Sequence, residues 1–211
     1  MTTGVVVSVF MNNISADVVR HQRAVLRKFV PSNFAVVQSL TGLSHAAALD
    51  DFMRSTQADL VLFLDIDCVP LTPDSVPTLA AHAAQGKLAG CVQRANHINN
   101  DAHLYVGPFC MAISRQLWGI LGRPSFEPTA RGDVGEEFTY RSQELGVSTH
   151  MLWPSAYEAA LWDLTEGRKF GLNTVYEESF LHTFNVREPE SQRKFIDRCR
   201  SIVLCPDSDR D

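Results

Sequence analysis

The chain has 211 residues, of which 45% are hydrophobic and 20% are charged. These values are ordinary for a globular protein and exclude disordered and collagen-like chains, and the length fits a single domain over residues 1–211. The 19 Lys and Arg residues are outnumbered by 24 Asp and Glu, which gives a net charge of −5. Because the sequence contains no basic stripe, we do not expect a nucleic-acid partner.

A membrane span and an extracellular disulfide framework are not expected either. No apolar run approaches the roughly 18 residues that a membrane-spanning helix needs, although peripheral association with a membrane stays open. The five cysteines are an odd count and include no Cys-x-x-Cys pair, which argues against a disulfide or zinc framework. We therefore predict reduced thiols and a cytoplasmic location.

The first third of the chain alternates between the hydrophobic periods of strands and helices. We predict strands over 5–10, 34–40 and 60–64, a helix that is capped by Ser15 or Asp17 and ends before Pro31, and a second helix over 44–57. Residues 60–64 are all apolar, as in a strand that is buried on both faces. This β-α-β-α-β order predicts a parallel sheet covered by helices.

The rest of the chain continues this pattern. We predict further strands over 87–93, 109–114, 147–153 and 178–184. We predict further helices from Asp74 to about Gln85, from the end of the 109–114 strand to Gly122, from an N-cap at Asp133 to Leu145 with Gly146 at the C-cap, and over 189–204. Residues 94–105 are polar and are expected to form a long loop, and residues 207–211 a frayed tail.

The strongest chemical signal is a pair of carboxylates behind the apolar strand. Asp65 and Asp67 come directly after residues 60–64, and alternate residues of an extended chain point the same way. Ligands of open α/β sheets bind beyond the carboxyl ends of the strands. Carboxylates this close repel each other unless a cation lies between them, and Mg²⁺ or Mn²⁺ prefers such oxygen ligands. In the structural alternative, the two aspartates only form the next turn.

The surroundings of this pair resemble the GT-A glycosyltransferases, the nucleotide-diphospho-sugar transferases that carry a DxD motif. Four segments are similar to that family, in the same order: ADLVLFLDIDCVPLTPDSV (58–76), YVGPFCMAISRQLW (105–118), GDVGEEFTYRSQELG (132–146) and FLHTF (180–184). The resemblance implies a GT-A type α/β fold with a mostly parallel central sheet flanked by helices. It also implies a metal-dependent transfer of a sugar from a nucleotide-diphosphate sugar to an unidentified acceptor, which is a glycan, a lipid or a protein.

The resemblance assigns metal and nucleotide ligands. Asp65 and Asp67 would bind Mn²⁺ or Mg²⁺ and the diphosphate of the donor, and His182 would complete the metal site. The nucleotide would lie over the ends of the first strands, and its expected contacts are Phe10, Asn12, Asp65 and Gly107. Each assignment keeps a structural alternative, because a lone histidine is usually structural and the residues after a strand often only turn the chain.

Three acidic residues compete for the catalytic role. The Glu-Asp pair of the family does not align cleanly, so the catalytic carboxylate is expected among Asp133, Glu136 and Glu137, with Glu137 favoured as the general base. In the structural alternative, Asp133 only caps the helix. The helix dipole favours carboxylates in the first turn whatever their function, which applies to Glu136 and Glu137.

Two other functions remain open. The motif also resembles the DxDx[TV] motif of haloacid-dehalogenase phosphatases, in which Asp65 would attack phosphorus and Asp67 would act as acid and base. That motif normally lies on the first strand, whereas here a β-α-β-α segment precedes it. Alternatively, the chain is a GT-A-like domain that binds a nucleotide or a sugar without turnover, because a fold does not by itself imply an activity.

Overall fold

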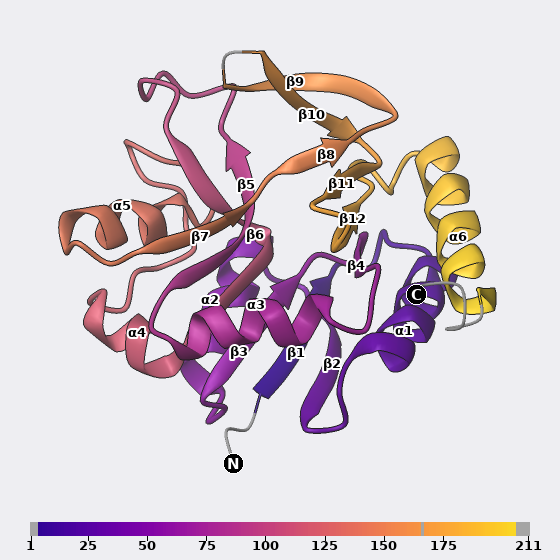
Figure 1. Ribbon diagram of the computed structural model, residues 1–211, viewed down its shortest axis with the longest axis horizontal. Coiled ribbons are helices and arrows are strands. Elements are labelled where there is room, and N and C mark those ends of the chain that lie inside the picture. Colours follow the sequence, from indigo (N-terminus) through magenta and orange to yellow (C-terminus); the bar gives the residue numbers. More distant parts are fainter. Residues whose placement is uncertain (1–3, 166, 206–211) are drawn as a thin grey trace.

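A six-stranded sheet lies at the centre of the computed structural model, which describes residues 4–165 and 167–205 (Figure 1). Its strands, in spatial order, are β2 (Phe34–Leu40), β1 (Gly4–Phe10), β3 (Leu60–Leu64), β6 (Leu104–Ser114), β5 (Leu88–Arg94) and β7 (Thr149–Leu152). β1 is parallel to β2 and β3, and β5 is parallel to β7, while β6 is antiparallel to both of its neighbours. The expected mostly parallel α/β sheet is confirmed, and the expected tail, 207–211, lies outside the described residues.

Helices cover both faces of the central sheet. The first face is covered by α1 (Ala16–Phe29) and α3 (Ser75–Ala84), and the second by α2 (His45–Ser55), α4 (Arg115–Ile120) and α5 (Glu136–Glu144). Alternate residues of β3 join the two cores, so that Leu62 packs in one with Leu79 of α3, and Phe63 packs in the other with Met53 of α2. Each such side chain contributes about 1.5–3 kcal/mol when fully buried, which explains why β3 is apolar throughout.

A second sheet brings the end of the chain to the carboxyl end of β3. Its strands, in spatial order, are β4 (Cys68–Pro70), β12 (Phe180–His182), β11 (Thr174–Tyr176) and β8 (Pro154–Ala156), and β9 (Ala159–Thr165) and β10 (Arg168–Leu172) form a separate hairpin. β12 pairs antiparallel with β4, with His182 opposite Cys68. The last helix, α6 (Pro189–Leu204), lies beside α1 (Figure 1), and their apolar contact includes Phe29 and Phe195.

Of the short strands of this second layer, only β12, which lies within the expected strand 178–184, is predicted by the sequence pattern. β4, β8 and β11 have three residues each, which is too few for an alternating pattern to be recognised. β9 and β10 pair with two register shifts, which interrupts the alternation. The predicted strand over 109–114 is shorter than β6, because Gly107 and Pro108 are residues that usually indicate a turn. They lie opposite a register irregularity between Gly90 and Val92 of β5, where a proline is tolerated.

The start of α5 also differs from the prediction. The helix begins at Glu136 and its N-cap is Gly135 rather than Asp133. Gly135 has a φ of 73°, which is left-handed and favours glycine. Asp133 therefore lies ahead of the helix, and its side chain bonds the backbone N–H of Val134 (2.7 Å) instead of capping the first turn. At the other end, the C-cap is Leu145, one residue earlier than expected, and Gly146 follows it with a left-handed φ of 66°.

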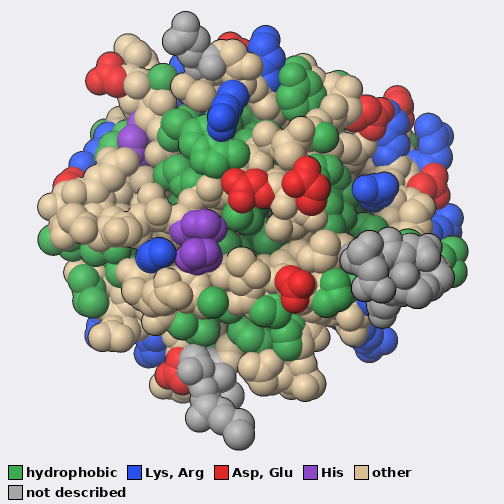
Figure 2. Space-filling view, viewed as in Figure 1, with side chains coloured by type: hydrophobic (Ala, Val, Ile, Leu, Met, Phe, Trp, Pro, Cys, Tyr) green, Lys and Arg blue, Asp and Glu red, His purple; other side chains and the backbone are tan. Residues whose placement is uncertain are grey.

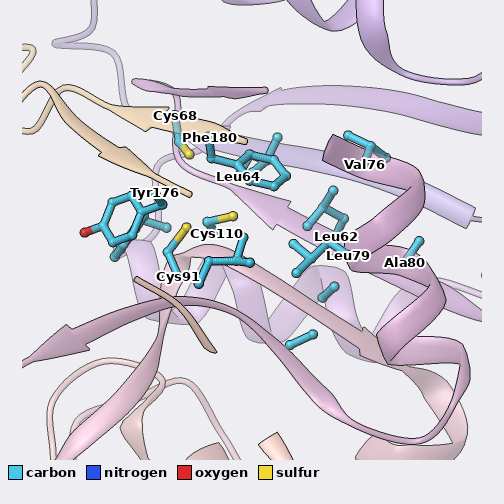
Figure 3. Packing of buried hydrophobic residues seen from close by; sticks show 14 of the residues in the cluster. Leu62, Leu64, Cys68, Val76, Leu79, Ala80, Cys91, Cys110, Tyr176 and Phe180 are labelled. Carbon is cyan, nitrogen blue, oxygen red and sulfur yellow. The ribbon is translucent and has the colours of Figure 1, made fainter. Parts of the chain in front are cut away.

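All five cysteines are free, which agrees with the predicted absence of a disulfide framework. Figure 3 shows Cys68, Cys91 and Cys110 within the apolar packing beside Tyr176. Burial raises the pKa of Cys199 to about 12, so this thiol stays protonated at neutral pH. Cys205 is the one cysteine that is not fully buried.

We expect one of the five thiols to react quickly in the native protein. Thiolates react and buried thiols do not, and only Cys205 of the five is accessible. The measurement is the stoichiometry of labelling by an aromatic disulfide reagent, with and without denaturant. A Cys205→Ser variant should lose the fast phase, and two or more fast thiols in the native wild type would contradict the buried positions of the others.

Acidic, basic and hydrophobic side chains are interspersed on the surface. On the face that Figure 2 shows, the Lys and Arg side chains form no continuous patch. None of the described helices combines the length and the apolar character that crossing a membrane would require.

Candidate active site

A pocket of about 500 Å³ lies beyond the carboxyl ends of β1 and β3. Its walls include Phe10 and Met11 at the end of β1, Asp65 and Asp67 after β3, and His182 of β12. These residues meet because β1 and β3 are parallel neighbours that end at the same edge, and because β12 is paired with β4 just beyond it. This edge is where open α/β sheets bind ligands.

Two carboxylates and an imidazole form a compact cluster in this pocket. Asp65, Asp67 and His182 each offer one ligand atom, and these atoms lie within 4.8 Å of one another. His182 Nε2 is 3.1 Å from Asp67 Oδ1, and these two side chains are only 4% and 10% exposed. The side chain of Asp65 is more open, at 28% exposed. The structure thus brings together the three residues that were expected to bind a metal.

The backbone of the turn that carries the two aspartates is anchored from both sides. Asp65 N–H donates to the carbonyl of Phe109 in β6 (2.9 Å), and Thr183 N–H donates to the carbonyl of Asp67 (3.0 Å). Within the turn, Cys68 N–H donates to the carbonyl of Asp65 (2.9 Å). Because these bonds fix the peptide groups, the two carboxylates are held in place before any ligand arrives.

The imidazole of His45, at the start of α2, compensates the charge of Asp65. Its Nε2 lies 3.0 Å from Asp65 Oδ1. The attraction of Asp65 raises the pKa of His45 and outweighs the opposite effect of burial. Burial by itself would raise the pKa of Asp65, but the charge and the hydrogen bond of His45, helped by His182, hold it below the usual value. Asp65 therefore stays ionised, as a metal ligand must be.

The donor set of the cluster fits a divalent cation. Carboxylate oxygens suit Mg²⁺ and Mn²⁺, and an imidazole nitrogen is a ligand that transition-metal ions accept. The ring of His182 lies against Phe109 (4.2 Å between centroids) and Phe184 (3.7 Å). Its Nδ1 is buried and has no hydrogen-bond partner among the described residues. Ring contacts thus hold the imidazole with Nε2 toward Asp67.

Asp133 is the only one of the three catalytic candidates among the described residues that line the pocket. Its side chain is 24% exposed, and its Oδ2 is 3.5 Å from the hydroxyl of Tyr105 and 3.9 Å from Nε2 of His97. Burial raises the pKa of Tyr105 well above its usual value, and the charge of Asp133 adds to this effect. Tyr105 therefore remains a neutral hydroxyl that can donate to Asp133.

Glu136 is fully buried and supports Asp133 from behind. Its Oε2 accepts the backbone N–H of Asp133 (2.8 Å), while its Oε1 accepts the amide of Asn100 (2.8 Å) and contacts Nδ1 of His103 (2.6 Å). The ring of His103 is stacked on Tyr140 with 3.9 Å between centroids. The carboxylate of Glu136 thus ties the 95–103 segment to the start of α5, and it does not reach the pocket.

Glu137, the carboxylate that the sequence favours as the base, lies outside the residues that line the pocket. Its carboxylate accepts from Nε of Arg131 (3.0 Å). The same guanidinium also bonds Glu144 (2.7 Å) and covers the ring of Tyr140 at 4.4 Å. This arrangement is a surface ion-pair network in which Glu137 is already paired.

Comparisons with known proteins agree on the fold. No protein-family model and no curated protein matches the chain. Among solved structures, the mannosyltransferase PcManGT from Pyrobaculum calidifontis, in complex with GDP-Man and Mn²⁺, matches with a TM-score of 0.50 at 16% identity. The match covers 71% of this chain and 54% of that one, so this chain spans about half the length of the mannosyltransferase. The chain has a GT-A-like fold.

Two further similar structures are nucleotidyltransferases. A nucleotidyl transferase from Methanothermobacter has a TM-score of 0.48 at 12% identity, over 74% of this chain and 89% of that one. The 2-C-methyl-D-erythritol 4-phosphate cytidylyltransferase from Thermus thermophilus has the same TM-score and identity, over 95% of this chain and 100% of that one.

Two of the four residues expected to contact a nucleotide line the pocket of the GT-A-like fold. Phe10 and Asp65 line the pocket, whereas Asn12 is an exposed turn residue that does not. Gly107 lies behind the wall, where an added Cβ would come within 2.4 Å of the ring of Phe109 and 2.6 Å of Oε1 of Gln93. Gly107 thus leaves room for two pocket residues.

Several residues in or beneath the pocket of this GT-A-like domain are not predicted by the sequence, among them Tyr105, Arg187 and Gln22. Tyr105 and Arg187 line it, and Gln22 bonds the carbonyl of Asp65 from below (2.7 Å). Gln22 carried a usable signal, because it is a polar residue on the otherwise apolar face of α1 that contains Val18 and Leu26. Tyr105 and Arg187 have no comparable signal in the sequence, because single polar residues at strand or loop ends are common.

Proposed function

We propose that the chain is a metal-dependent glycosyltransferase that moves a sugar from a nucleotide-diphosphate sugar to an acceptor hydroxyl. The observation that carries this proposal is the cluster of Asp65, Asp67 and His182 in the pocket of a GT-A-like fold. We favour Mn²⁺ as the ion, because the cluster offers an imidazole nitrogen besides two carboxylates.

The charge balance of the pocket supports a donor that binds together with a cation. Among the described lining residues, the guanidinium of Arg187 is the only Lys or Arg group, and it stands against four carboxylates: Asp65, Asp67, Asp133 and Glu188. A diphosphate would be repelled by this set unless a divalent cation lay between them. When bound, the cation would act as a Lewis acid on the departing nucleoside diphosphate. Arg187 would bind the remaining phosphate oxygens.

The other pocket residues would divide between the donor and the acceptor. Phe10 and Met11 would lie against the base or the ribose, since they provide apolar surface at the end of β1. Asp133 would accept a proton from the acceptor hydroxyl, or bind a hydroxyl of the transferred sugar, with Tyr105 holding its carboxylate. Glu136 would keep Asp133 in place through the backbone N–H.

Nucleotidyl transfer is the second candidate, because a divalent cation held by Asp65 and Asp67 would suit the phosphates of a nucleoside triphosphate as well. That reaction would bring a nucleoside triphosphate and a phosphorylated partner into the pocket, with more negative charge than one diphosphate. A single guanidinium among the described lining residues is a weak counter-charge for both substrates. The charge balance therefore favours the sugar donor.

The test is a thermal-shift panel with UDP, GDP, CDP and ADP, their sugars, and the four nucleoside triphosphates, each with Mn²⁺, with Mg²⁺ and with EDTA. A ligand at about 100 times its Kd stabilises by roughly 2.7 kcal/mol, and a chain of this size should then shift by about 5–11 °C. We expect such a shift with one nucleoside diphosphate family, in Mn²⁺ and not in EDTA. A shift with triphosphates alone would favour nucleotidyl transfer, and binding without turnover would favour a non-catalytic domain.

A further inference from the structure

Gln22 is a fully buried amide directly beneath the turn that carries Asp65 and Asp67. Its side chain is 0% exposed, and it belongs to the face of α1 that is otherwise apolar. A buried amide without partners is costly. Nε2 of Gln22 donates to the carbonyl of Asp65 (2.7 Å) and to the carbonyl of Cys68 (3.0 Å). One NH₂ group thus bridges the two ends of the turn.

The orientation of this amide follows from its partners. Two carbonyl oxygens face Nε2, and a carbonyl can only accept, so the NH₂ group must be on that side. Oε1 of Gln22 accepts from Nε2 of Gln38 in β2 (2.7 Å), which also donates to the carbonyl of Val19 (3.1 Å). At the surface, Nε of Arg23 donates to Oε1 of Gln38 (2.6 Å). A chain of side-chain hydrogen bonds therefore runs from the surface to the turn and leaves Gln22 one orientation.

The bridge acts on the spacing of the two candidate metal ligands. Asp65 and Asp67 are separated by one residue, so the relative direction of their carboxylates depends on the backbone between residues 65 and 68. The carbonyl of Phe109 accepts the N–H of Asp65, and the N–H of Thr183 donates to the carbonyl of Asp67. Gln22 holds the carbonyls of the first and last residues of the turn, Asp65 and Cys68.

We infer that Gln22 is a positioning residue, which sets the separation of the Asp65 and Asp67 carboxylates and thereby the affinity for a divalent cation. It touches neither the pocket nor the cation and acts through the backbone of the turn. The inference rests on the proposed function only in that Asp65, Asp67 and His182 hold the cation. Groups that orient metal ligands typically change the affinity 10–100-fold when they are removed.

The experiment measures the Kd for Mn²⁺ by the EPR signal of the free ion, in wild type and in Gln22→Met, without nucleotide. Methionine fills a similar volume but cannot donate to the two carbonyls. We expect a Kd that is about 10–100-fold higher than that of wild type. The matched control is Thr139→Val, which removes a buried hydroxyl from the backbone N–H of Val106 (3.1 Å) on the other face of the sheet. This control should bind Mn²⁺ within about twofold of wild type even if it unfolds at a lower temperature.

A second variant, Gln38→Met, provides a test of the inference if Gln22→Met does not fold. Gln38→Met leaves Gln22 in place and removes the donor that orients it, and we expect about a fivefold weaker affinity for Mn²⁺, equal to one net hydrogen bond. If wild type binds no Mn²⁺, the metal site of the proposed function is wrong. If wild type binds Mn²⁺ and Gln22→Met binds it equally well, the positioning role is overturned. If Gln22→Met does not fold, an unchanged Kd in Gln38→Met overturns it instead.

Discussion

Replacing Asp67 by Asn is expected to lower metal-dependent turnover at least about a thousandfold, because Lewis-acid stabilisation is worth several kcal/mol. Asn has the same shape but no charge, and Asp67 Oδ1 faces Nε2 of His182 at 3.1 Å in the candidate metal cluster. The fold should survive, since the turn is held by backbone bonds at Asp65 and at the carbonyl of Asp67 that the substitution leaves intact. The measurements are sugar transfer or donor hydrolysis with Mn²⁺, and the unfolding temperature in EDTA.

Two opposing effects keep the stability change small. The substitution removes the attraction between Asp67 and His182, and it also removes the repulsion between Asp67 and Asp65. We expect the unfolding temperature in EDTA to stay within about 4 °C of wild type, which corresponds to a net change near 1 kcal/mol. Wild type in EDTA should be as inactive as Asp67→Asn in Mn²⁺. Transfer at the parental rate by the variant would show that the metal assignment is wrong.

Replacing Asp133 by Asn is expected to lower kcat about 10²–10⁴-fold, the usual contribution of a positioned acid or base. Of the three acidic candidates, Asp133 is the one that lines the pocket. The amide oxygen can still accept the N–H of Val134, and the NH₂ group can donate to the hydroxyl oxygen of Tyr105, so the geometry around residue 133 should persist. Affinity for the free nucleoside diphosphate should change little, because the lost group acts on the acceptor or the transferred sugar. Single-turnover kinetics and a titration with the nucleoside diphosphate separate the two quantities.

Glu137→Gln is the matched control for this experiment. Glu137 lies on the first turn of α5 and is paired with Arg131 at the surface (3.0 Å), and such pairs contribute about 0–1 kcal/mol. Its kcat should stay within about twofold of wild type. A collapse of kcat in Glu137→Gln with normal turnover in Asp133→Asn would restore the carboxylate that the sequence favours. Glu136 is a poor probe of chemistry, because its buried carboxylate holds the 95–103 segment.

The sequence predicts those elements that have a clear hydrophobic pattern or a local capping residue. β3 is apolar over its whole length because both of its faces are buried, and the two aspartates after it fall at the edge where ligands bind. Ser15 is seen as a cap because its hydroxyl accepts the N–H of Asp17 (3.2 Å) within a few residues. Hydrophobic patterns and capping residues thus predict the elements that depend on neighbouring residues in the sequence.

The rest depends on contacts between distant residues. Glu136 is buried and bonded to Asn100 and His103, whereas the adjacent Glu137 is paired with Arg131 on the surface. No local sequence pattern predicts this difference. Both are acidic residues in a first helical turn, where the dipole favours them equally. Most strands of the second sheet are also set by partners, since β4 is three residues long and depends on β12 for its hydrogen bonds.

The antiparallel pairing of β12 with β4 determines when the candidate metal centre can exist during folding. His182 follows Asp67 by 115 residues, so the third ligand joins the first two only after most of the chain has emerged from the ribosome and a long loop has closed. Early folding of β1 to β3 must therefore proceed without His182, when His45 is already present to compensate Asp65 but Asp67 lacks its imidazole partner. The cation would therefore bind late in folding, after β12 has paired with β4.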